Sequence, residues 1–275
     1  MTADPHAPPA TGFPYLDAML DQPGAKLAMA HRGGAGHPSL TGVENSLFAF
    51  QHAVALGYRY LETDVHASKD GVLYSSHDEA LDRVTGYKGR IRQLTSAQVD
   101  SARIGGTHLV PTMASLFEAL PDCRFNIDIK TASAIEPLAA LVRSTGTRDR
   151  VLVASFSRAS LNRFRRLTDG LVATSAAPAE VALFMLAPTG ELARRLTGAR
   201  VAALQVPPYR HGLPVVTKSF VQRAHRAGVP VHVWTINTAA QMHRLLDLGV
   251  DGLITDRTDV LKEVLVERGQ WRDPA

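Results

Sequence analysis

The stretch YLETDVHASKDGVLYSSH, residues 60–77, determines how the rest of the chain can fold. Residues 60–66 are typical of a β-strand, and the Lys-Asp-Gly sequence at 69–71 is a turn signal before a second short strand signal at 72–74. We therefore predict a hairpin in which the second strand runs antiparallel to the first. His77 stands at the end of the return strand, so the same stretch also contains a candidate for chemistry.

Upstream of this hairpin the sequence predicts one strand, one loop and one helix. The strand signal Lys26 to Ala30 runs into a loop rich in glycine. Asn45 is placed to cap the N-terminus of the helix that follows, and Gly57 has the position of a left-handed C-terminal cap. Apolar residues between them recur at helical spacing, which completes one strand-loop-helix unit.

Downstream, strands and helices continue to alternate. Strand signals occur at residues 125–130, 151–156, 171–175, 201–206, 229–236 and 252–255. With the two early strands they make eight parallel strands, and a (β/α)8 barrel typically needs ~250 residues. We predict an α/β fold, a TIM (β/α)8 barrel with a small excursion of a hairpin and short helices after strand 2. The excursion includes residues 79–122, where Thr95 to Gln98 is a capping-box pattern, and we expect it to cover the barrel mouth.

The composition favours one domain and an anionic small-molecule partner. The chain has 275 residues, 45% of them hydrophobic, and we assign residues 25–275 to a single barrel domain and residues 1–24 to a flexible leader. A net charge of +4 suits an anionic substrate. The densest basic stretch, Arg158 to Arg166, lacks the interleaved aromatics of a nucleic-acid platform. We interpret it as a solvent-exposed helix face and expect no nucleic-acid partner.

Cys123 is the only cysteine, which excludes a disulfide within one chain and a thiolate zinc site. We expect it to be a small buried apolar group. No run of about 18 apolar residues occurs, and the first 20 residues lack the features of a signal peptide. We therefore expect no integral membrane segment and a cytoplasmic location, while the oligomeric state stays open.

Candidate site residues lie where strands end, because barrels of this type build their sites from the C-terminal ends of strands. Glu62 and Asp64 are two residues apart, so in a strand they point to the same face, roughly 6.5 to 7 Å apart. Two carboxylates facing an apolar interior are costly unless a metal ion or basic groups neutralise them. Arg32 and Lys130 could do so, but oxygen-only clusters suit Mg2+ or Ca2+, and we favour a metal site.

Five further residues join this cluster. Asp128 and Lys130 repeat the two-residue spacing on the next strand and add a carboxylate and a cation. Arg32 and the glycines after it offer a cation beside backbone N–H groups that can approach a phosphate closely. His31 and His77 supply two imidazoles, which can act as one acid and one base. A single histidine among eleven is more often structural, but the joint pattern favours catalysis.

These motifs together resemble the glycerophosphodiester phosphodiesterase family. The resemblance rests on HRGG at 31–34, ENS at 44–46, ETDV at 62–65, KDGVLYSSHDEALDRVTG at 69–86 and NIDIK at 126–130. It continues through ASF at 154–156, VHVWTIN at 231–237 and GVDGLITDRTD at 249–259, and so covers most of residues 28–263. It implies a TIM barrel that cleaves glycerophosphodiesters to sn-glycerol 3-phosphate and an alcohol with a divalent cation, Mg2+ or Ca2+.

The resemblance also implies a role for each matching residue. The implied acid and base are His31 and His77. The implied contacts to phosphate and substrate are Arg32, Lys130, Phe156 and Trp234. The implied metal ligands are Glu62, Asp64 and Asp128, with Glu44 on the metal or beside its ligands. The sequence departs from the family pattern at Asp128, where glutamate is more common.

Several other functions would need different features of the site. A phospholipase D-like enzyme that releases head groups from lysophospholipids would use the same residues beside an apolar groove. A barrel that only binds an anion would lack a working acid-base pair, and the retention of both histidines argues against it. A zinc amidohydrolase needs His-x-His where this chain has His31-Arg32-Gly33, and the following glycines miss the dinucleotide-binding spacing. Which histidine is the acid, and whether water or the glycerol hydroxyl attacks, stay open.

Overall fold

The computed structural model describes residues 10–19, 21–22 and 24–272. Eight parallel strands form its centre, and their sheet order is β8-β7-β6-β2-β1-β13-β12-β9. The strands are β1 (Leu27–His31), β2 (Tyr60–Ala67), β6 (Arg124–Ile129), β7 (Val151–Ala154), β8 (Ala173–Thr174), β9 (Leu204–Val206), β12 (Val231–Val233) and β13 (Gly252–Thr255). Strands that follow one another in the chain are therefore neighbours, and β13 returns to β1.

The two ends of this strand order meet and close the barrel. Ser175, next to β8, pairs with Ala203, next to β9, in a parallel bridge. The amide of Ala202 also donates to the carbonyl of Thr174 at 2.9 Å. The predicted (β/α)8 barrel is thus confirmed, although β8, β9 and β12 are shorter than their sequence signals.

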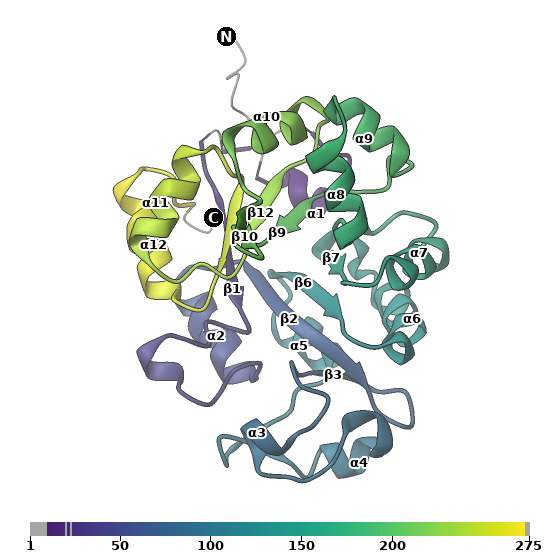
Figure 1. Ribbon diagram of the computed structural model, residues 1–275. Coiled ribbons are helices and arrows are strands. Elements are labelled where there is room, and N and C mark those ends of the chain that lie inside the picture. The colour runs from purple at the N-terminus through teal and green to yellow at the C-terminus, as the bar shows by residue number, and fades with distance from the viewer. Residues whose placement is uncertain (1–9, 20, 23, 273–275) are drawn as a thin grey trace.

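Helices surround the strands on the outside (Figure 1). The main ones are α2 (Leu47–Ala55), α5 (Met113–Ala119), α6 (Ile135–Thr145), α7 (Arg158–Leu167), α8 (Pro178–Leu186), α9 (Gly190–Leu196), α10 (Lys218–Arg226), α11 (Ala239–Asp247) and α12 (Thr258–Glu267). Single 3-10 turns occur at Pro38–Leu40, Ile91–Gln93, Ala132–Ala134 and Thr147–Arg150, and a small hairpin of β10 (Tyr209–Arg210) and β11 (Leu213–Pro214) follows β9. Cys123 is buried in the core between strands and helices, as expected.

The start of α2 corrects the predicted cap. Ser46 is the N-cap, and its hydroxyl accepts a hydrogen bond from the amide of Ala49 at 3.1 Å. Asn45 lies one residue earlier in a left-handed conformation, with φ of 59°. Its side-chain oxygen accepts from the hydroxyl of Thr63 in β2. Asn45 therefore turns the chain and joins two segments instead of capping the helix.

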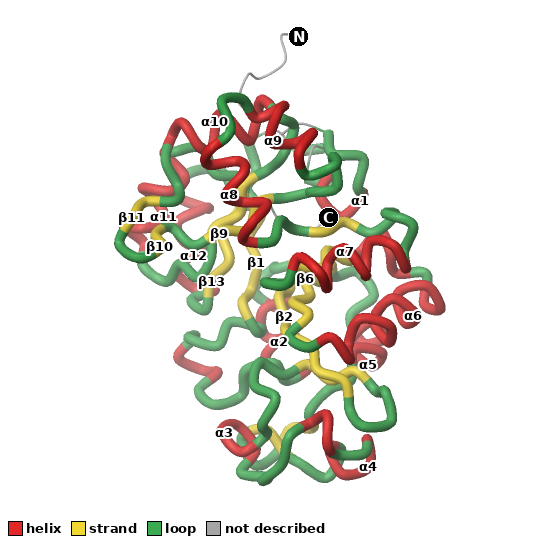
Figure 2. The backbone as a smooth tube through the Cα atoms, turned by 45° about the vertical axis from the view of Figure 1, so that its right-hand side comes forward, coloured by secondary structure: helices red, strands yellow, loops and turns green. Residues whose placement is uncertain are grey.

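The predicted hairpin is confirmed: β3 (Leu73–Ser75) runs antiparallel to β2, with Ser75 opposite Val65. The excursion beyond it holds α3 (Asp82–Thr85), α4 (Ser96–Val99) and an unpredicted hairpin of β4 (Arg103–Ile104) and β5 (His108–Leu109). It has a separate apolar cluster built from Tyr74, Leu81, Ile91, Val99, Ala102, Ile104 and Val110. Figures 1 and 2 both show α3 and α4 at the end of the molecule beyond β2. In contrast, α5 packs into the main core and belongs to the barrel.

Part of the segment predicted to be a flexible leader is packed against the barrel. Residues 1–9 lie outside the described residues. Within residues 10–19, the short helix α1 (Pro14–Asp17) buries Tyr15 and Leu16 against the ends of the strands where they begin. The hydroxyl of Tyr60, at the start of β2, donates to the carbonyl of Tyr15 at 2.8 Å. This contact corrects the expectation for that segment, because a buried tyrosine anchors it. Among the described residues, no helix is long and apolar enough to cross a bilayer.

The basic stretch on α7 is also only partly as expected. Arg166 is exposed, but Arg165 is buried and pairs with the buried Glu180 of α8 at 2.8 Å. The Arg165 guanidinium also donates to the hydroxyl of Thr174 at 2.8 Å and to the carbonyl of Ser175 at 3.0 Å. It thereby satisfies acceptors at the end of β8, where the barrel closes.

We predict that Arg165→Met destabilises the protein by about 3–5 kcal/mol, because it leaves the Glu180 carboxylate buried without its partner. Arg166→Met, a matched change on the exposed side of the same helix, should alter stability by less than about 0.5 kcal/mol. Urea unfolding followed by circular dichroism measures both. Equal effects of the two substitutions would contradict the structural role of Arg165.

Candidate active site

Parallel pairing places charged residues of three strands side by side at the C-terminal mouth of the barrel. His31 is the Cα partner of Glu62 across β1 and β2. Asp64 is the partner of Asp128 across β2 and β6. Glu62, Asp64 and Asp128 are all buried, so three carboxylates share a region of low water access. The sequence prediction that these residues come together is borne out by this register.

Two basic side chains neutralise most of this charge. The Nζ atom of Lys130 lies 2.7 Å from Oδ1 of Asp64 and 2.8 Å from Oδ2 of Asp128. The Nε atom of Arg32 lies 3.3 Å from Oδ2 of Asp64. The alternative in which Arg32 and Lys130 neutralise the carboxylates is thus present in the structure. It places two cations where a phosphate anion would need them.

Glu62 is the carboxylate with the least compensation. Its contacts are the amide of Arg32 at 3.3 Å and Nε2 of His31 at 3.7 Å. Burial raises the pKa of Glu62 to about 8, and the nearby charge of Asp64 adds to this rise. Burial also raises the pKa of Asp128, against the opposing effect of Lys130. The cluster therefore favours additional positive charge.

His31 lies between two carboxylates. Its Nδ1 atom is 2.5 Å from Oδ1 of Asp256, which follows β13, and its Nε2 atom faces Glu62. Burial lowers the pKa of His31, but Glu62 and Asp256 together outweigh burial and raise it. The imidazole is therefore held on one side and directed into the carboxylate cluster on the other.

The loop after His31 differs from its predicted role. The amides of Arg32, Gly34 and Gly36 donate to the carbonyls of Glu62, His31 and Asp256, respectively. These N–H groups thus hold the loop and are not free to bind a phosphate, which corrects the sequence-based expectation. Arg32 itself has φ of 52°, an uncommon value for a residue with a side chain. Its guanidinium, not the loop backbone, is the candidate phosphate contact.

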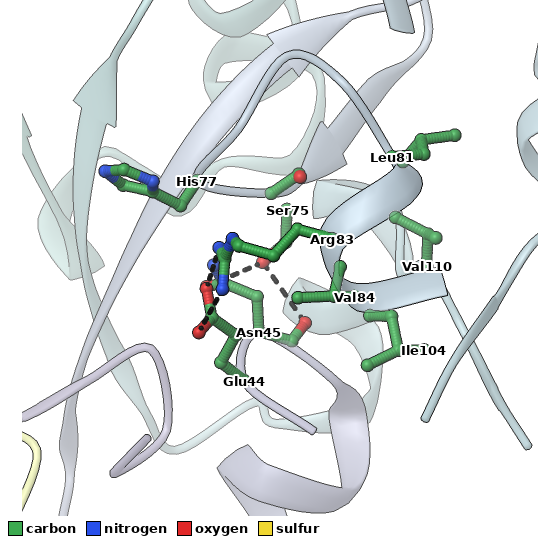
Figure 3. Close-up of a pocket in the computed structure, with 10 residues that line it drawn as sticks. Glu44, Asn45, Ser75, His77, Leu81, Arg83, Val84, Ile104 and Val110 are labelled. Carbon is green, nitrogen blue, oxygen red and sulfur yellow. Dashed lines mark hydrogen bonds and ion pairs between the residues drawn. The ribbon is translucent and has the colours of Figure 1, made fainter. Parts of the chain in front are cut away.

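Glu44 is occupied by two arginines. Its Oε1 atom lies 3.2 Å from Arg32 and 2.6 Å from Nη2 of Arg83, and its Oε2 atom accepts from Nη1 of Arg83 at 3.0 Å. Together these contacts lower the pKa of Glu44 despite its burial. In Figure 3 the Arg83 guanidinium points directly at the Glu44 carboxylate, within a small pocket that His77 also lines.

His77 reaches the cluster through its neighbours. Its Nδ1 atom lies 2.7 Å from Oδ1 of Asp78, and Oδ2 of Asp78 pairs with Nε of Arg83. The backbone carbonyl of His77 is 3.1 Å from Nε2 of His66, so His66 supports this loop from below. A continuous series of ion pairs then leads from the carboxylates of the barrel to Asp78, the partner of His77, through Asp128, Lys130, Asp64, Arg32, Glu44, Arg83 and Asp78.

Phe156 and Trp234, the two aromatic residues that the family resemblance implies as substrate contacts, lie beside each other. Their ring centroids are 5.9 Å apart with an edge-to-face angle of 83°. Phe156 is 65% exposed, which leaves most of its ring free for an apolar contact. Phe156 follows β7 and Trp234 follows β12, and neither strand is next to β2 in the barrel order. The two rings thus border the mouth of the barrel, apart from the ion-pair series.

Three residues at the site had no role assigned to them from the sequence. Asp256 and Asn237 follow strand signals, where polar residues are candidates, and they bind each other at 2.8 Å. Arg83 lies on α3 in the excursion, within the family-like stretch 69–86, but its spacing alone predicts no partner. Its contacts depend on how the excursion folds back toward Glu44.

The carboxylates fit a divalent cation by chemistry. Oδ2 of Asp64 and Oδ1 of Asp128 are buried and accept no hydrogen bond within the described part of the chain. Such oxygens are the ligands that Mg2+ and Ca2+ prefer. As they stand, no three histidine, cysteine, aspartate or glutamate side chains among the described residues form a cluster suited to a metal ion. Lys130 bridges two of the three candidates instead.

Residues 31–260 match the model of the glycerophosphoryl diester phosphodiesterase family. The chain is 42% identical over 250 residues to a probable glycerophosphodiester phosphodiesterase 2 of Mycobacterium tuberculosis, covering 90% of this chain and 94% of that protein.

Solved structures share the fold. A glycerophosphodiester phosphodiesterase of Agrobacterium tumefaciens superposes with a TM-score of 0.68 at 24% identity, covering 86% of this chain and 98% of the other. A phosphodiesterase of Oleispira antarctica, in complex with the product sn-glycerol-3-phosphate, gives a TM-score of 0.70 at 22% identity, with 88% and 97% covered.

We predict that Glu62 makes the chelator-treated protein less stable as the pH rises from about 5 to about 8. The pKa of Glu62 is about 8 in the folded state and ordinary in the unfolded state, so the folded state holds the extra proton in this window. The contribution of Glu62 to the free energy of unfolding therefore falls with rising pH. Glu62→Gln should reduce the fall by on the order of 3 kcal/mol, whereas the exposed Glu263→Gln should leave it unchanged. Urea unfolding at several pH values measures it, and parallel curves for the wild type and Glu62→Gln would contradict the prediction.

Proposed function

The chain belongs to the glycerophosphoryl diester phosphodiesterase family and is a phosphoric diester hydrolase, and we propose that it cleaves glycerophosphodiesters to sn-glycerol 3-phosphate and an alcohol by histidine acid-base chemistry with a divalent cation. One observation carries the proposal. His31 faces the buried Glu62 at the mouth of the barrel, where the buried Asp64 and Asp128 lie with the cations Arg32 and Lys130. The sn-glycerol-3-phosphate bound by the Oleispira antarctica protein supports the product assignment.

Arg32 and Lys130 are proposed to bind the phosphate. Both already lie against Asp64, whose carboxylate fixes their positions before substrate arrives. Preorganised cations of this kind stabilise the charge that builds up on the phosphoryl oxygens during transfer. Glu44 keeps Arg32 from swinging toward solvent, because it holds the far end of the same guanidinium.

Glu62, Asp64 and Asp128 are proposed to hold the divalent cation, with Glu44 beside them. The buried unpartnered oxygens of Asp64 and Asp128 and the raised pKa of Glu62 support this choice. When bound, a divalent cation polarises a phosphoryl oxygen and orients the diester. At such a site Glu62 would be charged, since added positive charge lowers a carboxyl pKa.

The two imidazoles are proposed to move protons. One removes the proton from the nucleophile, which is water or the glycerol hydroxyl, and the other gives a proton to the oxygen of the departing alcohol. His31 is held in the barrel by Asp256, and His77 is held in the excursion by Asp78. The two therefore approach from different elements, as attack and departure on opposite sides of a phosphorus atom require.

The alcohol moiety is proposed to lie against Phe156 and Trp234. An exposed ring suits either the small alcohol of a soluble diester or the glycerol end of a lysolipid. The site for charge is compact and the apolar contact is only two rings, which favours water-soluble diesters. Hydrolysis of lysophospholipids is the second candidate, supported by the exposure of Phe156.

We predict that His31→Ala and His77→Ala each lower kcat on glycerophosphocholine by about 100- to 10,000-fold, as loss of an acid or base requires. His243→Ala, on α11, is the matched control and should keep wild-type turnover. Wild-type kcat in both site variants would refute the assignment.

We further predict that chelation abolishes activity and that one of Mg2+, Ca2+ or Mn2+ restores it. The chelated enzyme is assayed with each ion on several glycerophosphodiesters and on one lysophospholipid. Rapid turnover of soluble diesters without detergent supports the first candidate, and turnover of the lysophospholipid alone supports the second. Activity indifferent to chelator would contradict the cation assignment.

A further inference from the structure

Asp256 binds His31 more closely than any other side chain does. The contact from Nδ1 of His31 to Oδ1 of Asp256 is 2.5 Å, and it joins residues 225 positions apart in the chain. The parallel pairing of β1 with β13 brings them together, because Ala30 is the Cα partner of Thr255, and His31 and Asp256 are the residues that follow these two in the chain. The carboxylate is thus supplied by closure of the barrel.

Asn237 fixes the carboxylate in turn. Its Oδ1 atom accepts from the backbone amide of Asp256 at 2.9 Å and from the hydroxyl of Thr255 at 3.2 Å. A backbone amide can only donate, so the amide oxygen of Asn237 must face it. The NH2 group is then the one that donates to Oδ2 of Asp256 at 2.8 Å. The orientation of this amide is set by the main chain.

We propose that Asp256, oriented by Asn237, is a positioning residue that holds the Nδ1–H tautomer of His31 and so makes Nε2 the atom that exchanges the proton with substrate. An ionised carboxylate has no proton to donate, so Nδ1 must be the donor. The lone pair of the neutral imidazole then lies on Nε2, which faces Glu62 and the proposed phosphate site. The same division of roles operates in hydrolases where a carboxylate orients a histidine.

Packing around Asp256 supports a fixed position. The carbonyl of Asp256 accepts from the amide of Gly36 in the loop after β1 at 3.0 Å. A Cβ atom on Gly36 would lie 2.9 Å from Cβ of Asp256, so only glycine allows the loop to approach this closely. The loop that carries Arg32 and the residue that orients His31 are therefore locked to each other.

The proposal rests on the proposed function in that His31 is taken to exchange the proton. The tautomer itself is measurable without substrate or turnover. The first measurement is 15N NMR of protein labelled at histidine, at a pH where His31 is neutral, with the His31 signals identified by their absence in His31→Gln. We expect the Nδ1–H form, and an Nε2–H form in the wild type would overturn the proposal.

The second measurement tests the variant Asp256→Asn, in which an amide replaces the carboxylate beside His31. In Asp256→Asn, Asn237 still donates to the side chain at position 256, which must turn its oxygen toward Asn237 and its NH2 toward His31. Nδ1 becomes an acceptor, and the proton moves to Nε2. We expect kcat to fall about 10,000-fold, the order found when an amide inverts the tautomer of a catalytic imidazole, with KM changed by less than about threefold.

The double variant Asp256→Asn/Asn237→Asp restores the pattern with the two groups exchanged. The carboxylate introduced at position 237 accepts from the NH2 at position 256, which turns the oxygen at position 256 back toward Nδ1–H of His31. Net charge and size match the wild type. We expect kcat to recover at least about tenfold over the single variant, together with the Nδ1–H signal.

Asp259→Asn is the control, because Asp259 pairs with Arg257 on the helix after the same strand and touches none of these groups. It should keep wild-type kcat and spectrum. Thermal unfolding verifies that the variants are folded. If folded Asp256→Asn keeps kcat within about threefold of the wild type, or the double variant shows no recovery, the proposal fails. If His31→Gln keeps wild-type turnover, the proposed function fails instead, whatever the tautomer.

Discussion

The register between β2 and β6 sets the electrostatic problem that the rest of the site answers. It places Asp64 directly beside Asp128 at the barrel mouth, where both are buried. Two adjacent carboxylates there are stable only beside positive charge, and Lys130 bridges them. Each added cation then needs its own partner, so opposite charges alternate from Asp128 outward to His77. The proposed phosphate site uses cations that are already in place, and the proposed cation site uses the carboxylate oxygens that accept no hydrogen bond.

The ion-pair series makes the excursion part of the active site. Arg83 of α3 is the link that joins Glu44, beside the barrel, to Asp78, beside His77. The excursion can hold this arginine in place because its own apolar cluster gives it a fixed shape. Its root is fixed as well, since the buried hydroxyls of Thr63 and Ser75 lie 2.5 Å apart and both contact Asn45. Packing of a segment remote from the barrel core thus controls the position of one of the two proposed proton carriers.

The sequence predicted what depends on local periodicity, and missed what depends on distant contacts. The two-residue spacings of Glu62 with Asp64 and of Asp128 with Lys130 were enough to bring four charges together, because strand geometry fixes their direction. The burial of Arg165 was not predicted because its partner Glu180 lies on another helix. The packing of Tyr15 was not predicted because its backbone carbonyl, which carries no sequence signal, accepts the hydrogen bond from Tyr60. The glycines after Arg32 looked like a phosphate loop, yet their amides bind carbonyls that only the folded chain supplies. Contacts between β1 and β13 need closure of the barrel, which no local pattern reports.

The two imidazoles therefore have different kinds of support, and this difference bears on mechanism. His31 is held by Asp256, which receives a second hydrogen bond from Asn237 and sits among strands of the closed barrel. His77 is held by Asp78, which shares its charge with Arg83 at the edge of the excursion and is half exposed. The first arrangement resists rotation of the ring, because every partner belongs to the sheet or its immediate ends. The second depends on ion pairs that lie farther from the sheet, from Asp78 through Arg83 to Glu44. The two proposed proton carriers therefore differ in how directly the barrel positions them.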